Sequence, residues 1–276
     1  MTYRNMPVKV NGGDPIMGTR VGVDFSTKNQ VKRQLAANID ANDQLRFNGD
    51  VDCKISVDFL VRSSDLSYDG LNFLSDLFHG TGKDTMLVSV GGNNYSECYI
   101  DSFNATVKPF EPVMGSVTFS SYNPSTAGTI TGVIDNNTNT LLGGNDFIYG
   151  HDCSLVGTGS VVRSNMLSEL TYTKTYSRSP VYTIGSKQAT NHLVDGVEVD
   201  MTVQSTGLNS FIDFSGSKLT STFGVLLEDI QDSGVHFASA DIDLTVSAGA
   251  HVVAEGYSVD GGGTLVTKAT IKEVIL

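Results

Sequence analysis

Alternation between hydrophobic and polar residues is the strongest pattern in this sequence. From Val51 to Val61 every second residue is Val, Cys, Ile or Phe, and most residues between them are polar. A period of two over this length predicts a long β-strand with one face on a core and the other toward water or a partner. Val197–Val203 shows the same alternation. Shorter segments predict further strands at Arg20–Phe25, Thr85–Val90, Cys98–Val107, Gly115–Tyr122, Leu170–Thr175, Phe237–Val246 and His251–Val259.

The two halves of the chain resemble each other faintly, at a spacing of about 138 residues. Thr129–Ile134 reads TITGVI and Thr270–Ile275 reads TIKEVI, so each would be the last strand of one half. Other echoes keep this spacing and order: Val10, Gly12 and Asp14 with Ile148, Gly150 and Asp152, Met86–Val90 with Gly224–Glu228, and Tyr99 with Phe237. The shared order predicts a tandem duplication, with a first domain at 1–135, a linker at 136–144 and a second domain at 145–276.

Helical periodicity is confined to short segments. Leu71–Phe78 places Leu71, Leu74 and Leu77 on one helical face, and Gly80 follows as a stop, so we expect one short helix there. Leu219–Ile230 also fits helical spacing, but the repeat predicts a strand at Phe223–Leu227, which we prefer. The expected fold is mainly β, with two tandem β-sandwich or β-barrel domains, each with a short flanking helix.

Two long polar segments interrupt the predicted strands, at Ser26–Asn48 and Tyr176–Asp195. Loops of this length within a compact domain are usually functional. They hold a large share of the 18 basic residues. The candidate contacts to a neighbouring copy are Lys28, Lys32, Arg33 and Arg46 in the first loop, and Arg178 and Lys187 in the second. Complementary charge would set register there, and ordinary solvated loops are the alternative.

Composition narrows the classes of partner. The formal net charge is −12 and only 17% of residues are charged, with many Ser and Thr, which suggests that other subunits cover part of the surface. An acidic protein repels nucleic acid and anionic membranes. The three cysteines form neither a metal-type pair nor a disulfide framework. The first ten residues lack the apolar centre of a secretion signal, and no apolar run is long enough to span a bilayer.

Motifs for chemistry fail on inspection. The run Gly80–Lys83 resembles a phosphate loop but lacks its first Gly and its final Ser or Thr. Asp135 starts a calcium-loop pattern that lacks the Gly and Glu at later positions. The five histidines are scattered without ligand spacing. We therefore predict a protein that is not an enzyme, with no cofactor and no metal site.

The whole pattern resembles the tail tube proteins of long-tailed bacteriophages: a duplicated acidic β protein, rich in Ser, Thr and Gly, with a long loop between two early strands of each half. The resemblance rests on no signature motif. It implies a virion structural protein that assembles into stacked rings around a channel for DNA. Ser26–Asn48 and Tyr176–Asp195 would be the stacking loops, and Val51–Val61 and Val197–Val203 would belong to the channel sheet, with Asp52, Lys54, Ser56 and Asp58 outward.

The resemblance further implies the partners. Three copies would form a pseudo-hexameric ring, other tail proteins would bind the tube, and DNA would pass without specific binding. The protein would be made in the host bacterial cytoplasm, reside in the virion and bind no membrane. Two alternatives remain: another virion ring, such as a baseplate or tail-end protein, or a carbohydrate-binding β-sandwich. The absence of Trp and an aromatic content of 8% disfavour the sugar binder.

Overall fold

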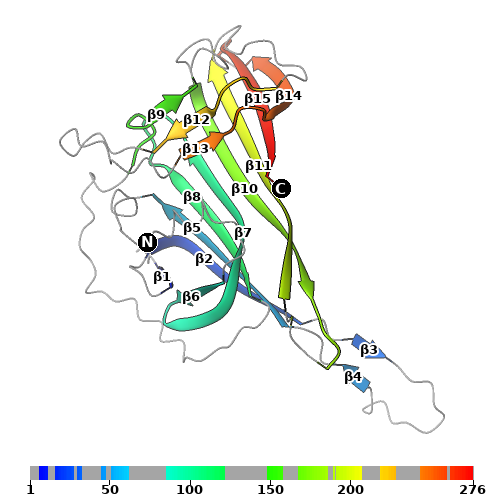
Figure 1. Cartoon of the computed structure of the whole chain (residues 1–276). Coiled ribbons are helices and arrows are strands. Elements are labelled where there is room, and N and C mark those ends of the chain that lie inside the picture. Colours follow the sequence, from blue (N-terminus) through cyan, green and yellow to red (C-terminus); the bar gives the residue numbers. More distant parts are fainter. Residues whose placement is uncertain are drawn as a thin grey trace.

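The fold is given by a computed structural model of the chain, in which every regular element among the described residues is a β-strand. The described residues are 6–11, 16–27, 30–32, 45–47, 51–61, 85–121, 148–157, 167–185, 189, 191–206, 218–227, 243–259 and 262–275. The chain is thus mainly β, as its alternating sequence predicts, and its strands form a large antiparallel sheet (Figure 1).

The strands of the first half are β1 (Met6–Val10), β2 (Ile16–Thr27), β3 (Gln30–Lys32), β4 (Leu45–Phe47), β5 (Val51–Leu60), β6 (Met86–Val90), β7 (Asn93–Val107) and β8 (Met114–Ser121). Those of the second half are β9 (Ser154–Val156), β10 (Leu167–Val181), β11 (Asn191–Thr206), β12 (Phe223–Leu226), β13 (Asp243–Val246), β14 (His251–Val259) and β15 (Leu265–Ile275).

Eight of these strands form one continuous antiparallel path across the molecule. Its order is β2, β5, β8, β7, β10, β11, β15 and β14. The first four strands come from the first half of the chain and the last four from the second, and the junction lies between β7 and β10. In Figure 1 this path runs from β5 and β8 through β7, β10 and β11 to β14 at the outer edge.

The first half closes on itself. β1 pairs with both β2 and β6, and β6 pairs with the first part of β7, so β1, β2, β5, β8, β7 and β6 form a closed ring of pairings. Apolar side chains fill its interior, since Ile55, Phe59, Phe103 and Phe119 are fully buried. Burying such side chains contributes about 1.5–3 kcal/mol each.

The second half is built from two pieces. β10, β11, β15 and β14 continue the large sheet, whereas β9, β12 and β13 form a three-stranded sheet of their own. Val225, Leu244 and Val246 of the small sheet are buried in the same apolar cluster as Met201 and Ile271 of the large sheet. One core therefore extends through both halves, and Ile148, near the start of the second half, is hydrogen-bonded to Val61 and Val113 of the first.

Several sequence-based predictions are confirmed here. Val51–Val61 forms β5, Val197–Val203 lies within β11, and Phe223–Leu226 is strand β12, as the repeat predicts and helical spacing does not. Asp52, Lys54, Ser56 and Asp58 lie on the open face of β5, opposite the buried Cys53, Ile55, Val57 and Phe59. The predicted helix at Leu71–Phe78, the segment Thr129–Ile134 and the linker at 136–144 lie outside the described residues.

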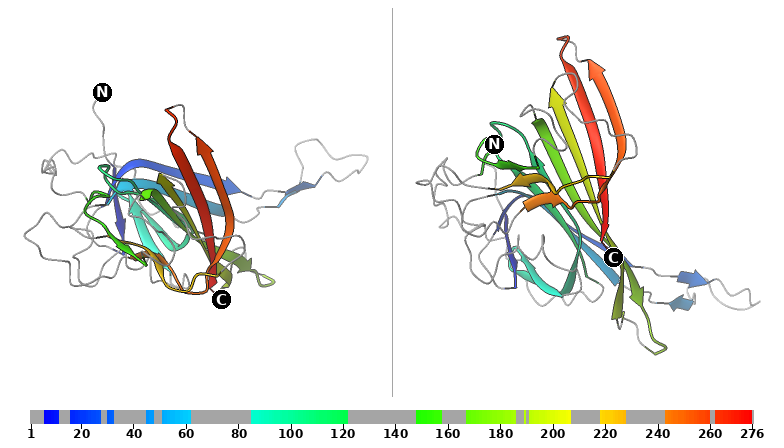
Figure 2. Two further views of the ribbon diagram at one scale, coloured as in Figure 1. Left: turned by 90° about the horizontal axis from the view of Figure 1, so that it is seen from above. Right: turned by 45° about the horizontal axis from the view of Figure 1, so that its top comes forward.

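One predicted loop is wrong. Tyr176–Asp195 is mostly strand, because β10 continues to Val181 and β11 begins at Asn191, where those two residues pair. Tyr176 is buried and Val194 packs against the core, but most of the segment is polar, and cross-strand pairing of β10 with β11 holds it. Both hairpins, β2–β5 and β10–β11, leave the body on the same side, with β3 and β4 at the far tip of the first (Figures 1 and 2).

Candidate functional site

The open face of the eight-stranded path is the largest candidate surface. On each strand it carries the residues that alternate with the buried ones, and hydroxyl or amide side chains are its largest group. Its neutral polar members include Ser56, Ser102, Asn104, Thr106, Ser116, Thr118, Ser120, Thr171, Thr173, Thr175, Thr202, Gln204 and Thr270. The open face is therefore polar and rich in short hydroxyl side chains.

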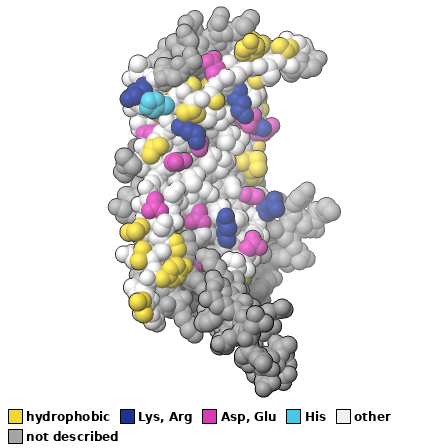
Figure 3. Space-filling view, turned by 90° about the vertical axis from the view of Figure 1, so that its right-hand side faces the viewer, with side chains coloured by type: hydrophobic (Ala, Val, Ile, Leu, Met, Phe, Trp, Pro, Cys, Tyr) yellow, Lys and Arg dark blue, Asp and Glu magenta, His cyan; other side chains and the backbone are white. Residues whose placement is uncertain are grey.

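Charges of both signs are interspersed on this face. Its carboxylates include Asp24, Asp52, Asp58, Asp101, Glu169, Glu198 and Asp200, and its cations include Arg20, Lys54, Lys108, Lys268 and Lys272. Figure 3 shows positive and negative side chains scattered together over one side of the molecule. The described open face is thus of mixed charge, more balanced than the net charge of −12 suggests.

Two of these cations are held by carboxylates on neighbouring strands. Lys272 Nζ lies 2.9 Å from Asp200 Oδ1, where β15 pairs with β11. That hydrogen bond and the Asp200 charge raise the pKa of Lys272. Lys108 Nζ lies 3.9 Å from Glu169 Oε1, across the junction between the halves. A lysine paired in this way offers less free positive charge to a passing phosphate.

Asp101 is a half-buried carboxylate of this group. It sits where β7 bulges against β8, between Ile100 and Ser102, and its carboxylate accepts a hydrogen bond from the Ser120 hydroxyl. Burial raises the pKa of Asp101, and the Ser120 hydrogen bond opposes this rise. The Asp101 carboxylate thus links β7 to β8 through Ser120, and this structural role accounts for it.

The junction between the halves is a regular antiparallel pairing. Six residues of β10 pair with six of β7, from Leu170 opposite Val107 to Thr175 opposite Ser102. On the open face, Asn104 Nδ2 donates a hydrogen bond of 2.8 Å to Thr173 Oγ1. On the core face, Leu170, Tyr172, Val107 and Ala105 are buried.

The two ends of the strand order, β2 and β14, each have a largely open edge among the described residues. β1 pairs with the second edge of β2 from Ile16 to Gly18, and beyond Gly18 no described strand pairs with that edge. β14 pairs along its length with β15, and its other edge has one isolated bridge, between His251 and Lys218; from Val252 to Val259 no described strand pairs with that other edge. Tyr257 is 82% exposed, Val259 64% and Phe25 51%. Exposed strand edges that carry large apolar residues are ready templates for pairing with another chain.

Sequence reasoning did not find these edges. The alternation in His251–Val259 predicts a strand but contains no information on which neighbours it has, so the open edges were not recognised. Instead, we had expected contacts from six loop cations. Lys28, Arg33 and Lys187 lie outside the described residues. Lys32 and Arg46 lie on the paired strands β3 and β4, of which the structure describes the backbone but not the side chains.

Arg178 is the one predicted contact residue whose side chain the structure describes. It lies on β10, and its guanidinium carbon is 4.7 Å from the Tyr99 ring centre and 5.7 Å from that of Tyr176. Stacking of this kind contributes about 0.5–2 kcal/mol. Arg178 therefore packs within its own chain, and a contact with a neighbouring copy stays a prediction.

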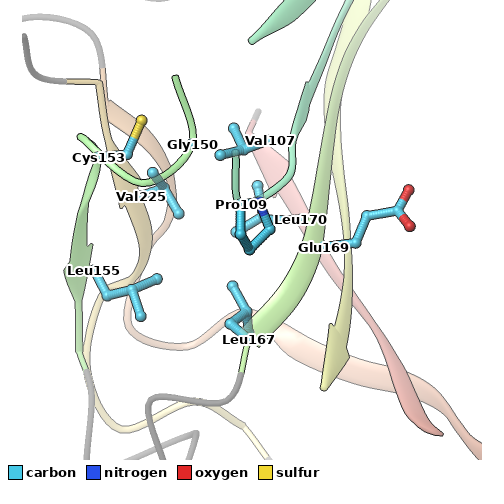
Figure 4. Close-up of a pocket in the computed structure, with 9 residues that line it drawn as sticks. All are labelled: Val107, Pro109, Gly150, Cys153, Leu155, Leu167, Glu169, Leu170 and Val225. Carbon is cyan, nitrogen blue, oxygen red and sulfur yellow. The ribbon is translucent and has the colours of Figure 1, made fainter. Parts of the chain in front are cut away.

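A small cavity of about 100 Å³ lies at the junction of the halves (Figure 4). It is lined mainly by apolar side chains, including Val107, Leu155, Leu170 and Val225, while the carboxylate of Glu169 points away from it. Pockets that hold ordinary small-molecule ligands are about 300–1,000 Å³ and contain converging polar groups. We interpret this cavity as a packing gap between β7, β9, β10 and β12.

The described residues contain no cluster of three or more His, Cys, Asp or Glu that could hold a metal ion. Within the same residues, no helix is long and apolar enough to cross a membrane. No family model matches the chain, and no curated protein matches its sequence. The geometry of the sheet is therefore the basis for any functional conclusion.

Proposed function

We propose that this chain is a structural protein of a bacteriophage tail, in which copies assemble into rings that stack into a tube for DNA. The observation that carries the proposal is the eight-stranded sheet, with a polar open face and, among the described residues, an edge at each end that is unpaired over most of its length. A sheet of this kind can be extended by further copies in both directions. A head-to-tail contact that closes by rotation makes a ring.

The proposal includes an internal duplication, which the strand registers support. Ile55 pairs with Phe119 as Met201 pairs with Ile271. Val23 pairs with Ile55 as Tyr172 pairs with Met201. The small sheet fits too, since Val10 pairs with Val88 as Leu155 pairs with Val225, and Val88 with Tyr95 as Val225 with Leu244. Every one of these pairings occurs twice, in the same chain order.

Two β-bulges recur at matching places. The register shift between Gly18 and Arg20 opposite Phe59 and Asp58 has its counterpart between Leu167 and Glu169 opposite Ser205 and Gln204. The shift between Ile100 and Ser102 opposite Phe119 matches the shift between Val252 and Ala254 opposite Ile271. Bulges are specific features that families retain, so their coincidence supports common descent of the two halves.

These registers change the expected alignment of the halves. By its pairings, β15 corresponds to β8 and β14 to the second part of β7, whereas the sequence echoes had matched Thr270–Ile275 with Thr129–Ile134. The halves thus differ by small insertions along the chain, which is why a single spacing does not align them. The boundaries at 135 and 145 remain part of the proposal.

Ring size follows from the sheet if three copies join. Twenty-four strands spaced about 4.8 Å apart and tilted by about 40° would close a barrel with a backbone radius on the order of 24 Å. Barrels of roughly 16–18 strands already enclose an aqueous channel. In this arrangement the open polar face lines the lumen, where paired lysines and abundant hydroxyl groups would let DNA slide.

The two hairpins that leave the body on one side are suited to the contact between rings. They correspond to the predicted stacking segments, although the second is a strand hairpin and not a loop. Contacts with other tail proteins would be made at the ends of the tube.

Electron microscopy of the purified full chain, with solution mass measured in parallel, tests the proposed function. We expect rings of three copies with pseudo-sixfold symmetry, or hollow filaments built from them, at high protein concentration. Rings that never stack would point instead to a single ring at a baseplate or tail end. A monodisperse monomer at every concentration would contradict the proposal.

A further inference from the structure

We infer that β14 of one copy pairs antiparallel with β2 of the next copy, with Val259 opposite Val21 and Ala254 opposite Ser26. The inference rests on the ring assembly proposed above and specifies its interface. The intervening pairs are Ser258 with Gly22, Tyr257 with Val23, Gly256 with Asp24, and Glu255 with Phe25. The partner is thus a second copy of this chain, bound edge to edge.

The register is taken from the junction inside the chain. By the matching bulges, β2 corresponds to β10, so that Val21 is equivalent to Leu170 and Val23 to Tyr172. By the second pair of bulges, β14 corresponds to the last part of β7, so that Val259 is equivalent to Val107 and Tyr257 to Ala105. Since Leu170 pairs with Val107 within the chain, Val21 should pair with Val259 between chains.

Side-chain volumes at the two junctions agree. Inside the chain, the large Tyr172 on β10 lies opposite the small Ala105 on β7. At the inferred interface, the smaller Val23 on β2 would lie opposite the large Tyr257 on β14. The aromatic residue is thus on β10 at the internal junction and on β14 at the inferred interface. Each junction pairs one aromatic residue with one smaller residue, as close packing requires.

The next core-facing pair shows the same exchange. Within the chain, the buried Lys174 on β10 lies opposite Phe103 on β7. At the inferred interface, Phe25 on β2 would lie opposite Glu255 on β14. Here too the charged and aromatic members exchange strands. These two exchanges favour this register over a slip of one residue, which would turn the side chains to opposite faces.

Exposure of the edges agrees with a surface that is covered on assembly. Tyr257, Val259 and Phe25 are exposed in the single chain, whereas their equivalents Ala105, Val107 and Lys174 are buried at the internal junction. Val21 and Val23 are half-buried and already pack against the core. Pairing would therefore extend the core across the interface and satisfy the backbone groups along both edges.

Engineered disulfides test this register. The variant Gly22→Cys with Ser258→Cys, in a Cys153→Ser background, places two thiols at an inferred cross-strand pair. Gly22 has open space where a Cβ would stand, and Ser258 is exposed. The native thiols Cys53 and Cys98 are buried, and burial raises their pKa values to about 11 and about 12, so they should remain unreactive.

The chain offers matched controls. Thr106→Cys with Thr171→Cys occupies the equivalent pair of the internal junction and should form an intrachain disulfide under the same oxidising conditions. Gly22→Cys with Ala254→Cys lies four residues out of register, where the Cα atoms are too far apart to be bridged. A mixture of the two single-cysteine chains, Gly22→Cys and Ser258→Cys, should yield covalent dimers as the largest linked product.

We expect the in-register variant to form covalent oligomers between chains, in about tenfold excess over the out-of-register variant. The inference is overturned if the internal control oxidises while the folded in-register variant keeps free thiols at high concentration, or if both interchain variants link equally. If electron microscopy shows rings but this disulfide does not form, the inferred register is wrong and the proposed ring assembly is still supported. If the disulfide forms but no rings or tubes are seen, the pairing of β14 with β2 is supported and the proposed tube function is contradicted.

Discussion

Asn104 on β7 donates a hydrogen bond of 2.8 Å from Nδ2 to Thr173 Oγ1 on β10, and this bond joins the two halves of the chain on the open face of the sheet. Both residues are half-buried. A side-chain hydrogen bond between neutral groups contributes about 0.5–1.5 kcal/mol. It therefore adds a small directional term to a junction held mainly by backbone pairing and by Leu170 and Val107.

Removing this bond should weaken the fold modestly. We expect Asn104→Ala to lower the free energy of unfolding by about 1 kcal/mol, because the Thr173 hydroxyl loses its partner. Urea unfolding followed by circular dichroism measures the change. Thr175→Val, at an exposed position of β10 two residues from Thr173, is the control and should stay within about 0.5 kcal/mol of the parent. Equal losses in both variants would deny the bond any specific role.

Gly115 should tolerate no side chain. A Cβ at this position would stand 2.6 Å from the ring of Phe59, its cross-strand partner, in a fully packed core. We predict that Gly115→Ala costs about 1–3 kcal/mol of stability, as overpacking does. Gly22→Ala on the same sheet meets no atom within 4 Å and should be neutral or slightly stabilising. Thermal unfolding of the two variants distinguishes packing at Gly115 from a general intolerance of substitution.

Asp101 should make stability depend on pH. Its folded pKa is raised by burial, so the folded protein holds this proton more tightly than the unfolded chain does. Stability is therefore lost as pH rises from the unfolded pKa, about 3.9, through the raised folded pKa. Asp101→Asn keeps an acceptor for the Ser120 hydroxyl and removes the buried charge. As pH rises through this window, the stability of the Asp101→Asn variant relative to the parent should increase and then become constant. Unfolding experiments at a series of pH values measure this difference. A constant difference would contradict this account.

Charge on the open face should control adhesion of DNA. Asp200→Lys removes the partner of Lys272 and adds a cation to this face. We expect the assembled variant to bind duplex DNA more tightly than the parent. Its affinity should also fall more steeply with salt concentration, by about one or two released counterions for each chain that contacts the DNA. Glu111→Lys, an equal charge change in the turn after β7, is the control. If Glu111→Lys binds DNA as well as Asp200→Lys does, the open face has no special role in passage.

The strands were predictable from sequence because alternation is a local property. Val51–Val61 and Val197–Val203 show their buried and open faces directly, and the polar set Asp52, Lys54, Ser56 and Asp58 follows from it. The extent of strands beyond the core was not predictable. Most residues of Tyr176–Asp195 are polar and show no regular alternation, so they do not indicate that cross-strand pairing continues β10 and β11.

The sequence by itself determined an acidic, mainly β chain whose strands bury one face and leave a polar face open. Only the tertiary structure decided which strands are neighbours, because pairing joins residues far apart in the chain and leaves no local trace. That decision placed β10 of the second half against β7 of the first, and left β2 and β14 with described edges that have no strand beside them over most of their length. The junction at Leu170 and Val107 thereby became the template for the interface inferred at Val21 and Val259.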